Sequence, residues 1–268
     1  MIFKLRKLVK GDIKALYHLQ PEGWQDIVYY FDYYVQNPSC YPFCAEANGM
    51  IIGVGNAICN GYTGWLSHII VEKGSRRMGV GKAITNRLIE FLLDKGSKTL
   101  LLIATAEGGH LYRKLGFKTD LFYSCFRGRI EGELISDKVK ILKNQRIDEI
   151  LEIDRYITNE DRSKFIEPFL TDVRVYISEK CKIEGFYVPA LGEGPVIAKN
   201  LQAGLELLKL KHLVQEKKST IPETNSMTIK FFEEKGCIEY NQIERMYFGE
   251  HLEWHSSLIF SRIGGFIG

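Results

Sequence analysis

A basic stretch with three glycines, Gly74–Ala83, contains the residue types that bind a phosphate group. A strand-like run, 65–71, precedes it, and a helix-like run, 82–95, follows it. Backbone N–H groups at the start of a helix lack partners and lie at the positive end of the helix dipole, so they attract anions. Glycine has no Cβ atom, which lets a pyrophosphate approach the backbone. The stretch is therefore predicted to bind a phosphate-bearing ligand.

Two common nucleotide-binding motifs do not fit this stretch. The Walker loop requires a Gly where this chain has Arg76, and Ser or Thr where it has Ala83. The dinucleotide fingerprint requires its third Gly at the position of Ile84. The pattern Gln/Arg-x-x-Gly-x-Gly/Ala fits at every fixed position of the run Arg76–Gly81.

This pattern resembles the acyl-CoA pyrophosphate loop of the GNAT (GCN5-related) N-acetyltransferases. A second run, Leu111–Phe117, resembles that family's signature of a Tyr on a short helix followed by Gly-Phe. The expected elements also follow the family order, which is a strand, two helices and a three-stranded antiparallel meander leading into the phosphate loop. The resemblance covers about residues 1–127 and predicts a catalytic GNAT domain there.

Residues 128–268 are predicted to form a second, non-catalytic domain. The runs Gly194–Ala198, Pro222–Asn225 and Arg245–Tyr247 resemble the GNAT-like C-terminal domain of tandem bacterial acetyltransferases. In place of a phosphate loop this half has an acidic residue, Glu193, which repels pyrophosphate, and Pro195, which has no N–H. A second, unorthodox CoA site is the alternative.

The predicted fold class is α/β with mixed sheets, in two tandem GNAT-like domains. Each domain is expected to have a central, twisted, mostly antiparallel sheet flanked by helices. The resemblance implies that acetyl-CoA lies along strand 65–71 and splays it from strand 99–103. Backbone groups of Ile69, Ile70 and Val71 would then hold the thioester and pantetheine. The pyrophosphate would lie on Arg76, Arg77, Met78, Gly79, Val80, Gly81 and Lys82.

Three residues are the main candidates for acid–base catalysis of acetyl transfer. In the resemblance, Tyr112 lies near the CoA sulfur, contacts the cofactor and protonates the departing thiolate. The general base is left open between His68, beside the thioester and with a pKa suited to the task, and Glu72, at the end of the same strand. Glu107 is a weaker candidate.

The segment 24–35 is dense in aromatic residues and is predicted to be a helix. A helix that is aromatic on more than one face is either deeply buried or lines a cavity. In the resemblance this region covers the acceptor site. The predicted acceptor-binding residues are Trp24, Tyr29, Tyr30, Tyr33 and His68.

Composition limits the other roles of this 268-residue chain. A net charge of +3 argues against a nucleic-acid partner held by bulk charge, and no apolar run approaches the length of a membrane span. Six scattered cysteines and no apparent export signal favour free thiols in the cytoplasm. We therefore expect acetyl-CoA and a small amine as partners, no metal, and a monomer or homodimer. The rival functions are an idle acyl-CoA-binding regulator and a protein lysine acetyltransferase.

Overall fold

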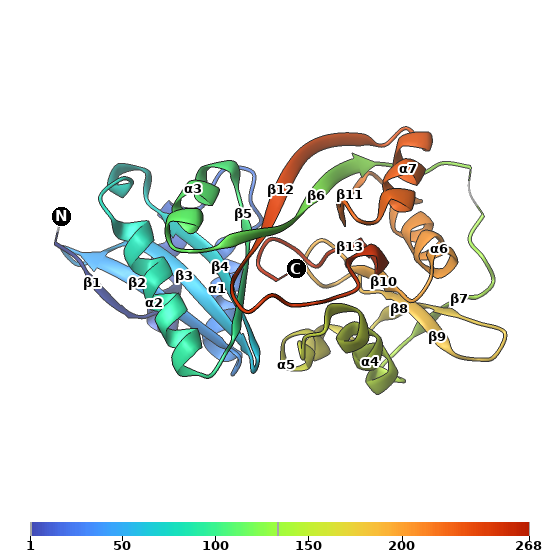
Figure 1. The fold of residues 1–268 in the computed structure, drawn as a ribbon, viewed down its shortest axis with the longest axis horizontal. Coiled ribbons are helices and arrows are strands. Elements are labelled where there is room, and N and C mark those ends of the chain that lie inside the picture. The colour runs from blue at the N-terminus through green and yellow to red at the C-terminus, as the bar shows by residue number, and fades with distance from the viewer. Residues whose placement is uncertain (1, 133, 268) are drawn as a thin grey trace.

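The computed structural model describes residues 2–132 and 134–267, and over these residues it contains an eight-stranded and a five-stranded sheet (Figure 1). The larger sheet has the order β1-β2-β3-β4-β5-β12-β6-β11, and the smaller has the order β13-β10-β9-β8-β7. Helices flank both sheets, so the predicted mixed α/β fold is confirmed.

The first half begins with β1 (Lys4–Lys7), a 3-10 helix η1 (Lys10–Leu19), α1 (Ile27–Gln36), β2 (Cys40–Ala47), β3 (Met50–Asn60) and β4 (Thr63–Val71). It continues with η2 (Lys73–Ser75), α2 (Val80–Asp94), β5 (Thr99–Ala104), α3 (Ala106–Lys114) and β6 (Lys118–Gly128). The antiparallel pairs β2–β3 and β3–β4 form the predicted meander.

The second half begins with β7 (Val139–Leu142), α4 (Ile147–Thr158), α5 (Ser163–Ile166), η3 (Glu167–Phe169), β8 (Val173–Ile177) and β9 (Ile183–Tyr187). It continues with β10 (Val196–Ala198), α6 (Leu201–His212), β11 (Lys217–Pro222), α7 (Ser226–Glu234), β12 (Ile238–Gly249), η4 (Ser256–Leu258) and β13 (Ile259–Ser261). The order β10-α6-β11-α7-β12 repeats the order β4-α2-β5-α3-β6 of the first half.

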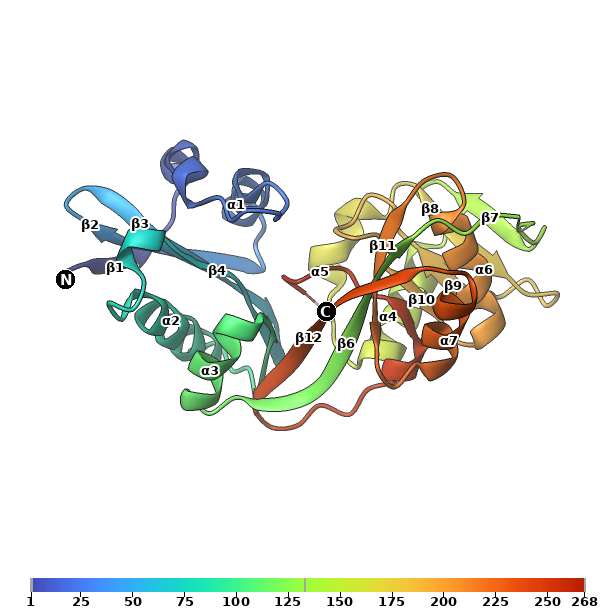
Figure 2. The same cartoon turned by 90° about the horizontal axis from the view of Figure 1, so that it is seen from above.

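The corresponding strands β6 and β12 are exchanged between the halves (Figure 2). β12 pairs with β5 of the first half along Thr99–Ala104, while β6 pairs with β11 of the second half along Tyr123–Gly128. β6 and β12 also pair with each other. The larger sheet therefore takes strands from both sides of residue 128, which makes the two halves mutually dependent.

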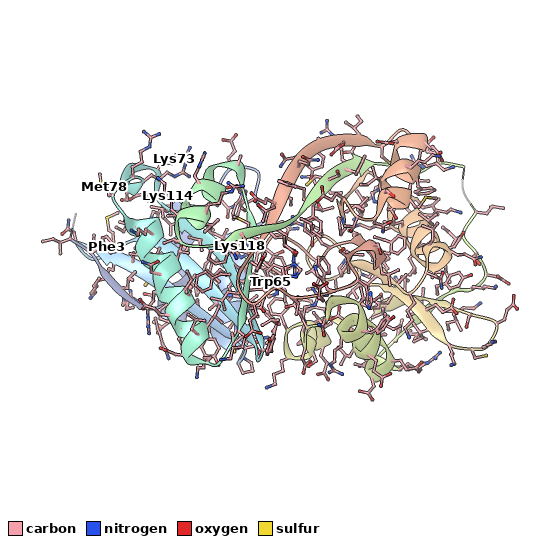
Figure 3. The ribbon with its side chains drawn as sticks, in the orientation of Figure 1. Phe3, Trp65, Lys73, Met78, Lys114 and Lys118 are labelled. Atoms are coloured by element: carbon pink, nitrogen blue, oxygen red, sulfur yellow. The ribbon has the colours of Figure 1, made fainter. Side chains whose placement is uncertain are left out.

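A buried carboxylate, Glu160, joins the second half to β4. It accepts hydrogen bonds from Trp65 Nε1 at 2.7 Å and from Thr63 Oγ1 at 2.9 Å. The guanidinium of Arg245 lies 5.4 Å from the Trp65 ring centre and 4.2 Å from that of Trp254. These contacts fix β4 against the second half at the place where Figure 3 labels Trp65.

β4 contains a β-bulge at His68. Val54 pairs with Ile70 and Asn56 with Ser67, so two residues of β4 oppose the single residue between them on β3. His68 has a φ of 46°, which is rare for a residue with a side chain. The alternation of side chains in a regular strand predicts that Leu66, His68 and Ile70 share one face, and the bulge makes this prediction wrong. The extra residue reverses the alternation, so Leu66 and Ile70 pack in different core clusters on opposite faces.

β4 and β5 are parallel neighbours only at their starts. Thr63–Trp65 pairs with Thr99–Leu101, and in the described part of the chain no further β4–β5 pairing is present. Parallel strands that pair at one end and part at the other leave unpaired backbone groups in the opening. This divergence agrees with the predicted splay between strands 65–71 and 99–103.

Candidate active site

The phosphate loop opens directly onto the first turn of α2. Gly79 is the residue before the helix and has a φ of 84°, and no side chain caps the helix there. The first-turn N–H groups of an uncapped helix have no partner within the helix. The turn contains no acidic residue, so an anion meets only the positive end of the helix dipole.

The surroundings of the loop keep it open and basic. A Cβ atom on Gly79 would meet no atom within 4 Å, so space remains in front of the helix. A Cβ atom on Gly81 would lie 3.5 Å from Val71 of β4 and 3.8 Å from Leu111 of α3, so the loop lies between these elements. Figure 3 places Lys73, Met78 and Lys114 toward this end of the first half. The residues predicted to bind pyrophosphate thus meet around the start of α2.

The residues predicted to bind the thioester and pantetheine lie where β4 leaves β5. Ile70 and Val71 pair with β3 on one side, and past Trp65 no pairing with β5 is present among the described residues. Ile69 and Val71 are half-buried against the α2 side of the core, whereas Ile70 is buried on the α1 side. The opening between the strands can therefore take an extended chain beside the β4 backbone.

Tyr112 lies in the second turn of α3, next to Leu111, whose side chain lies near Gly81 of the phosphate loop. Its ring covers Gly108, where a Cβ atom would lie 2.9 Å from Tyr112 Cε2, and it contacts the Phe117 ring edge to face. Within residues 2–132 and 134–267 its hydroxyl has no hydrogen-bond partner. Burial raises the pKa of Tyr112 to about 12, so the hydroxyl keeps its proton at neutral pH. A protonated, unengaged hydroxyl is the state that a proton donor requires.

His68 projects from the bulge into an aromatic cluster between β4 and α1. Its Nδ1 atom lies 2.7 Å from the Tyr34 hydroxyl. Burial lowers the pKa of His68 to about 4, so the ring is neutral at neutral pH but is a weaker base than the ordinary imidazole that the sequence-based prediction assumed. Its aromatic neighbours are Trp24, Tyr30, Phe31, Tyr34 and Phe266.

The other two candidates for the general base differ from His68 in their surroundings. Glu72 precedes the 3-10 turn η2, and its Oε2 accepts a hydrogen bond from Ser75 Oγ at 2.9 Å. This hydrogen bond holds the Glu72 carboxylate on the turn that starts the phosphate loop. The side chain of Glu107 lies outside the part of the structure that is described.

A small pocket of about 80 Å³ lies between α1 and the second half. Three of the predicted acceptor-binding residues, Tyr29, Tyr30 and Tyr33, line it, whereas His68 is not part of its lining. Trp24 does not line it. The helix starts only at Ile27, where Asp26 caps it by accepting a hydrogen bond from Val28 N. The expected helix 24–35 therefore began too early, and Trp24 lies before it, 42% exposed, with its ring 5.9 Å from His68.

The far wall of this pocket was not predicted from the sequence. It consists of Phe165, Phe169, Ala190, Leu191, Gly192 and Phe266, all from the second half. The Tyr33 hydroxyl donates a hydrogen bond to the Phe165 carbonyl at 3.0 Å and so crosses between the halves. No motif marks these residues. Phe165 and Phe169 lie on the short helices α5 and η3, the others lie in loops, and all of them meet α1 only through packing between segments distant in sequence.

A larger groove of about 670 Å³ lies elsewhere, between α4 and the segment before η4. It includes none of the predicted site residues. Its lining residues are Glu152, Arg155, Tyr156, Asn159, Glu253, Trp254 and His255.

In the second half, as far as its residues are described, no open phosphate loop precedes α6. Only Lys199 and Asn200 connect β10 to α6, and Asn200 Oδ1 caps the helix by accepting from Ala203 N at 2.9 Å. The run Leu191–Pro195 was expected before the main helix, but it lies before β10 instead. Glu193 in that run binds Arg262 and Thr220. This cap uses the Ala203 N–H, a donor that a phosphate at the start of α6 would need.

Three further features of residues 2–132 and 134–267 concern metal binding, thiols and membrane segments. No group of three or more His, Cys, Asp or Glu side chains in these ranges is placed to hold a metal ion. All six cysteines are free thiols, as predicted, and four of them are buried. In the same ranges the helices are too short or too polar to cross a membrane.

Comparison with known families matches both halves. The sequence profile of the Acetyltransferase (GNAT) family matches residues 10–117, and that of an Acetyltransferase (GNAT) domain matches residues 150–261. A proposed acetyltransferase of Bacillus subtilis is 28% identical over 80 residues, which are 30% of this chain and 54% of that protein. The chain spans about half the length of the curated relatives it matches.

Two solved structures resemble nearly the whole fold. A proposed acetyltransferase from Pyrococcus horikoshii has a TM-score of 0.86 at 19% identity, over 99% of this chain and 96% of that one. The tandem GNAT protein from the clavulanic acid biosynthesis pathway has a TM-score of 0.66 at 12% identity, over 94% of this chain and 100% of that one. At these identities the likeness establishes the fold.

Proposed function

Because the chain belongs to the GNAT acetyltransferase family and carries two GNAT domains in tandem, we propose that it is an acetyl-CoA-dependent N-acetyltransferase. It transfers the acetyl group directly to a primary amine of a small-molecule or amino-acid-like acceptor. The observation that carries the proposal is the opening between β4 and β5, which leads to the uncapped start of α2. Both features suit an extended thioester that ends in a pyrophosphate.

We assign catalysis to residues 1–127 and a non-catalytic role to residues 128–268. The first half has the open loop, Tyr112 and His68. In the second half Asn200 caps the corresponding helix, and the connection from β10 has only two residues. One donor site per chain is therefore expected, completed by β12 and the pocket wall from the second half.

The reaction forms a C–N bond and breaks the thioester C–S bond. The acceptor amine attacks as a neutral nucleophile and loses a proton, and the CoA thiolate leaves and gains one. Tyr112 has a pKa of about 12, so it is protonated at neutral pH and supplies the proton to the thiolate. His68 accepts the amine proton at Nε2 when its Nδ1–H donates to Tyr34. Backbone N–H groups of the β4 bulge stabilise the oxyanion.

The pocket favours a small acceptor over a protein lysine. A site for a lysine tail requires an open, acidic groove, whereas the pocket beside His68 is about 80 Å³ and lined by uncharged residues. Turnover with any amine separates this proposal from an idle acyl-CoA-binding regulator. We further propose a cytoplasmic monomer or homodimer, since all six thiols are free.

A calorimetric titration of acetyl-CoA tests the donor site. Gly79→Asp adds a negative charge at the start of α2, in a residue with a φ of 84°. Gly61→Asp is the matched control, since Gly61 has a φ of 77°, no neighbour within 4 Å of a Cβ atom, and a place in the β3–β4 turn.

We expect one equivalent of acetyl-CoA to bind the wild-type protein and the Gly61→Asp variant, with affinity at least tenfold weaker in Gly79→Asp. Two equivalents, one of them unaffected by Gly79→Asp, would assign a donor site to the second half. Absence of binding to the wild-type protein would overturn the acetyltransferase proposal.

A further inference from the structure

Residues 259–263 fill the cleft of the second half that corresponds to the β4–β5 opening. By chain order β10 and β11 correspond to β4 and β5. β13 pairs antiparallel with β10, and Arg262 N donates to the Thr220 carbonyl of β11 at 3.0 Å, so the segment lies between the two strands (Figure 1). This segment occupies the space where an extended ligand would lie in the first half.

Two buried side chains, Lys211 of α6 and Phe260 of the segment, anchor residues 259–263 there. Lys211 Nζ donates to Ser261 Oγ at 2.8 Å and to the Gly194 carbonyl at 2.9 Å, which ties the segment to the turn before β10. The Phe260 ring lies over Gly204, where a Cβ atom would come within 2.2 Å of it. The chain therefore leaves the cleft of the second half at a fixed point and in a fixed direction.

From that point the chain carries Phe266 into the candidate active site. The Phe266 ring stacks on His68 with centroids 5.5 Å apart and planes 20° apart, and it lies 4.8 Å from Tyr30. It is 3% exposed and lines the pocket beside α1. One ring thus contacts both the proposed general base and the proposed acceptor pocket.

Two glycines leave room for this ring. A Cβ atom on Gly264 would lie 2.7 Å from Phe266 Cε1, so a larger residue there displaces the ring. A Cβ atom on Gly192 would lie 2.2 Å from the Ile263 carbonyl oxygen and 3.1 Å from Phe266 Cζ. Gly265, the next residue, is exposed, and its nearest neighbour would be 3.9 Å away. The position of the Phe266 ring therefore depends on the absence of side chains at Gly264 and Gly192.

We propose that Phe266 determines acceptor specificity and restricts the acceptor to small, apolar primary amines. The pocket of about 80 Å³ is far below the roughly 300–1,000 Å³ that encloses drug-sized ligands. Its lining consists of tyrosines, phenylalanines and small apolar residues, without a charged side chain to pair with a second ionic group. The inference rests on the proposed function, because it concerns the acceptor side of the same reaction.

The test compares kcat/KM for propylamine and benzylamine, with acetyl-CoA as donor, in five proteins. These are the wild-type protein and the variants Phe266→Ala, Phe266→Leu, Gly264→Ala and Gly265→Ala. We expect the wild type to prefer propylamine, and Phe266→Ala to raise the benzylamine-to-propylamine ratio at least tenfold, since even one methylene in an apolar pocket discriminates by about 10–200-fold. Phe266→Leu should raise the ratio less.

Gly264→Ala should change the ratio at least threefold by displacing the ring, whereas Gly265→Ala should leave it unchanged. Unaltered acetyl-CoA affinity in each variant shows that the fold and donor site persist. Equal ratios in all five proteins would overturn the inference, and so would a wild type that acetylates a charged or larger amine but neither of these two. Failure of the wild type to bind acetyl-CoA would instead contradict the proposed function.

Discussion

The Tyr34 hydroxyl and His68 Nδ1 lie 2.7 Å apart and join helix α1 to the bulge of β4. Burial raises the pKa of Tyr34 well above 10 and lowers that of His68 to about 4, so both groups are neutral at neutral pH. The bond can therefore form in two ways. If Nδ1–H donates to Tyr34, then Nε2 has a free lone pair, whereas the opposite tautomer has none.

Tyr34→Phe is expected to lower kcat at least tenfold with acetyl-CoA affinity unchanged, because it removes the partner that fixes the imidazole tautomer. His68→Ala should lower kcat at least as much, and the double variant should be no slower than His68→Ala alone. Tyr17→Phe is the control, since Tyr17 is 67% exposed on η1. Steady-state kinetics check this, and a wild-type kcat in Tyr34→Phe would remove the positioning role.

Tyr112→Phe is expected to lower kcat by roughly 10²-fold or more, the usual contribution of a general acid. The ring packs on Gly108 and Phe117 and remains in the variant, so acetyl-CoA affinity should change little. Tyr123→Phe is a matched control, because Tyr123 is a buried tyrosine whose hydroxyl also lacks a partner among the described residues. If both variants keep full turnover, Tyr112 is not the proton donor.

Those parts of the site that depend on local backbone could be predicted from the sequence. The run Arg76–Gly81 signals a phosphate loop because the ligand contacts consecutive backbone groups at one helix start. Tyr112 follows in a short helix at a fixed distance along the chain. For the tyrosines of α1, the aromatic faces of one helix indicated either deep burial or a cavity, and the family resemblance indicated the acceptor site. Tyr29, Tyr30 and Tyr33 line a pocket in the structure.

The parts that depend on distant contacts could not be predicted in the same way. Alternation identifies 239–248 as a strand but does not say which sheet it joins, and β12 joins the sheet of the first half. The bulge at His68 has no glycine to signal its positive φ. Phe266 reaches His68, and Glu160 reaches β4, only through tertiary packing. The short strand β13 has no sequence pattern of its own.

Glu160→Ala is expected to lower the free energy of unfolding by about 3 kcal/mol, because it leaves the buried donors of Trp65 and Thr63 without an acceptor. Glu160→Gln retains one acceptor oxygen and should cost less. Glu179→Ala is the control, since Glu179 forms an ion pair with Lys138 at the surface and is 87% exposed. Urea denaturation measures all three, and similar midpoints for Glu160→Ala and Glu179→Ala would contradict the bridging role.

His212 should make stability depend on pH between about 6.5 and 4. Its ring is fully buried, with Nδ1–H donating to the Gly128 carbonyl at 2.9 Å and Nε2 accepting from Ser219 Oγ at 2.8 Å. Burial lowers its pKa from 6.5 to about 4. A lowered pKa means that the unfolded chain takes up the proton first, so stability is complete above pH 6.5 and is lost as the pH falls toward 4.

The expected loss through His212 is on the order of 3 kcal/mol, because each pKa unit corresponds to about 1.4 kcal/mol. Urea denaturation of the wild type and of His212→Asn at pH 7.0, 5.5 and 4.5 isolates the contribution of His212, since all other residues are the same in both proteins. The difference in unfolding free energy between the two should shrink as the pH falls. A constant difference over this range would show that His212 is not held neutral by the fold.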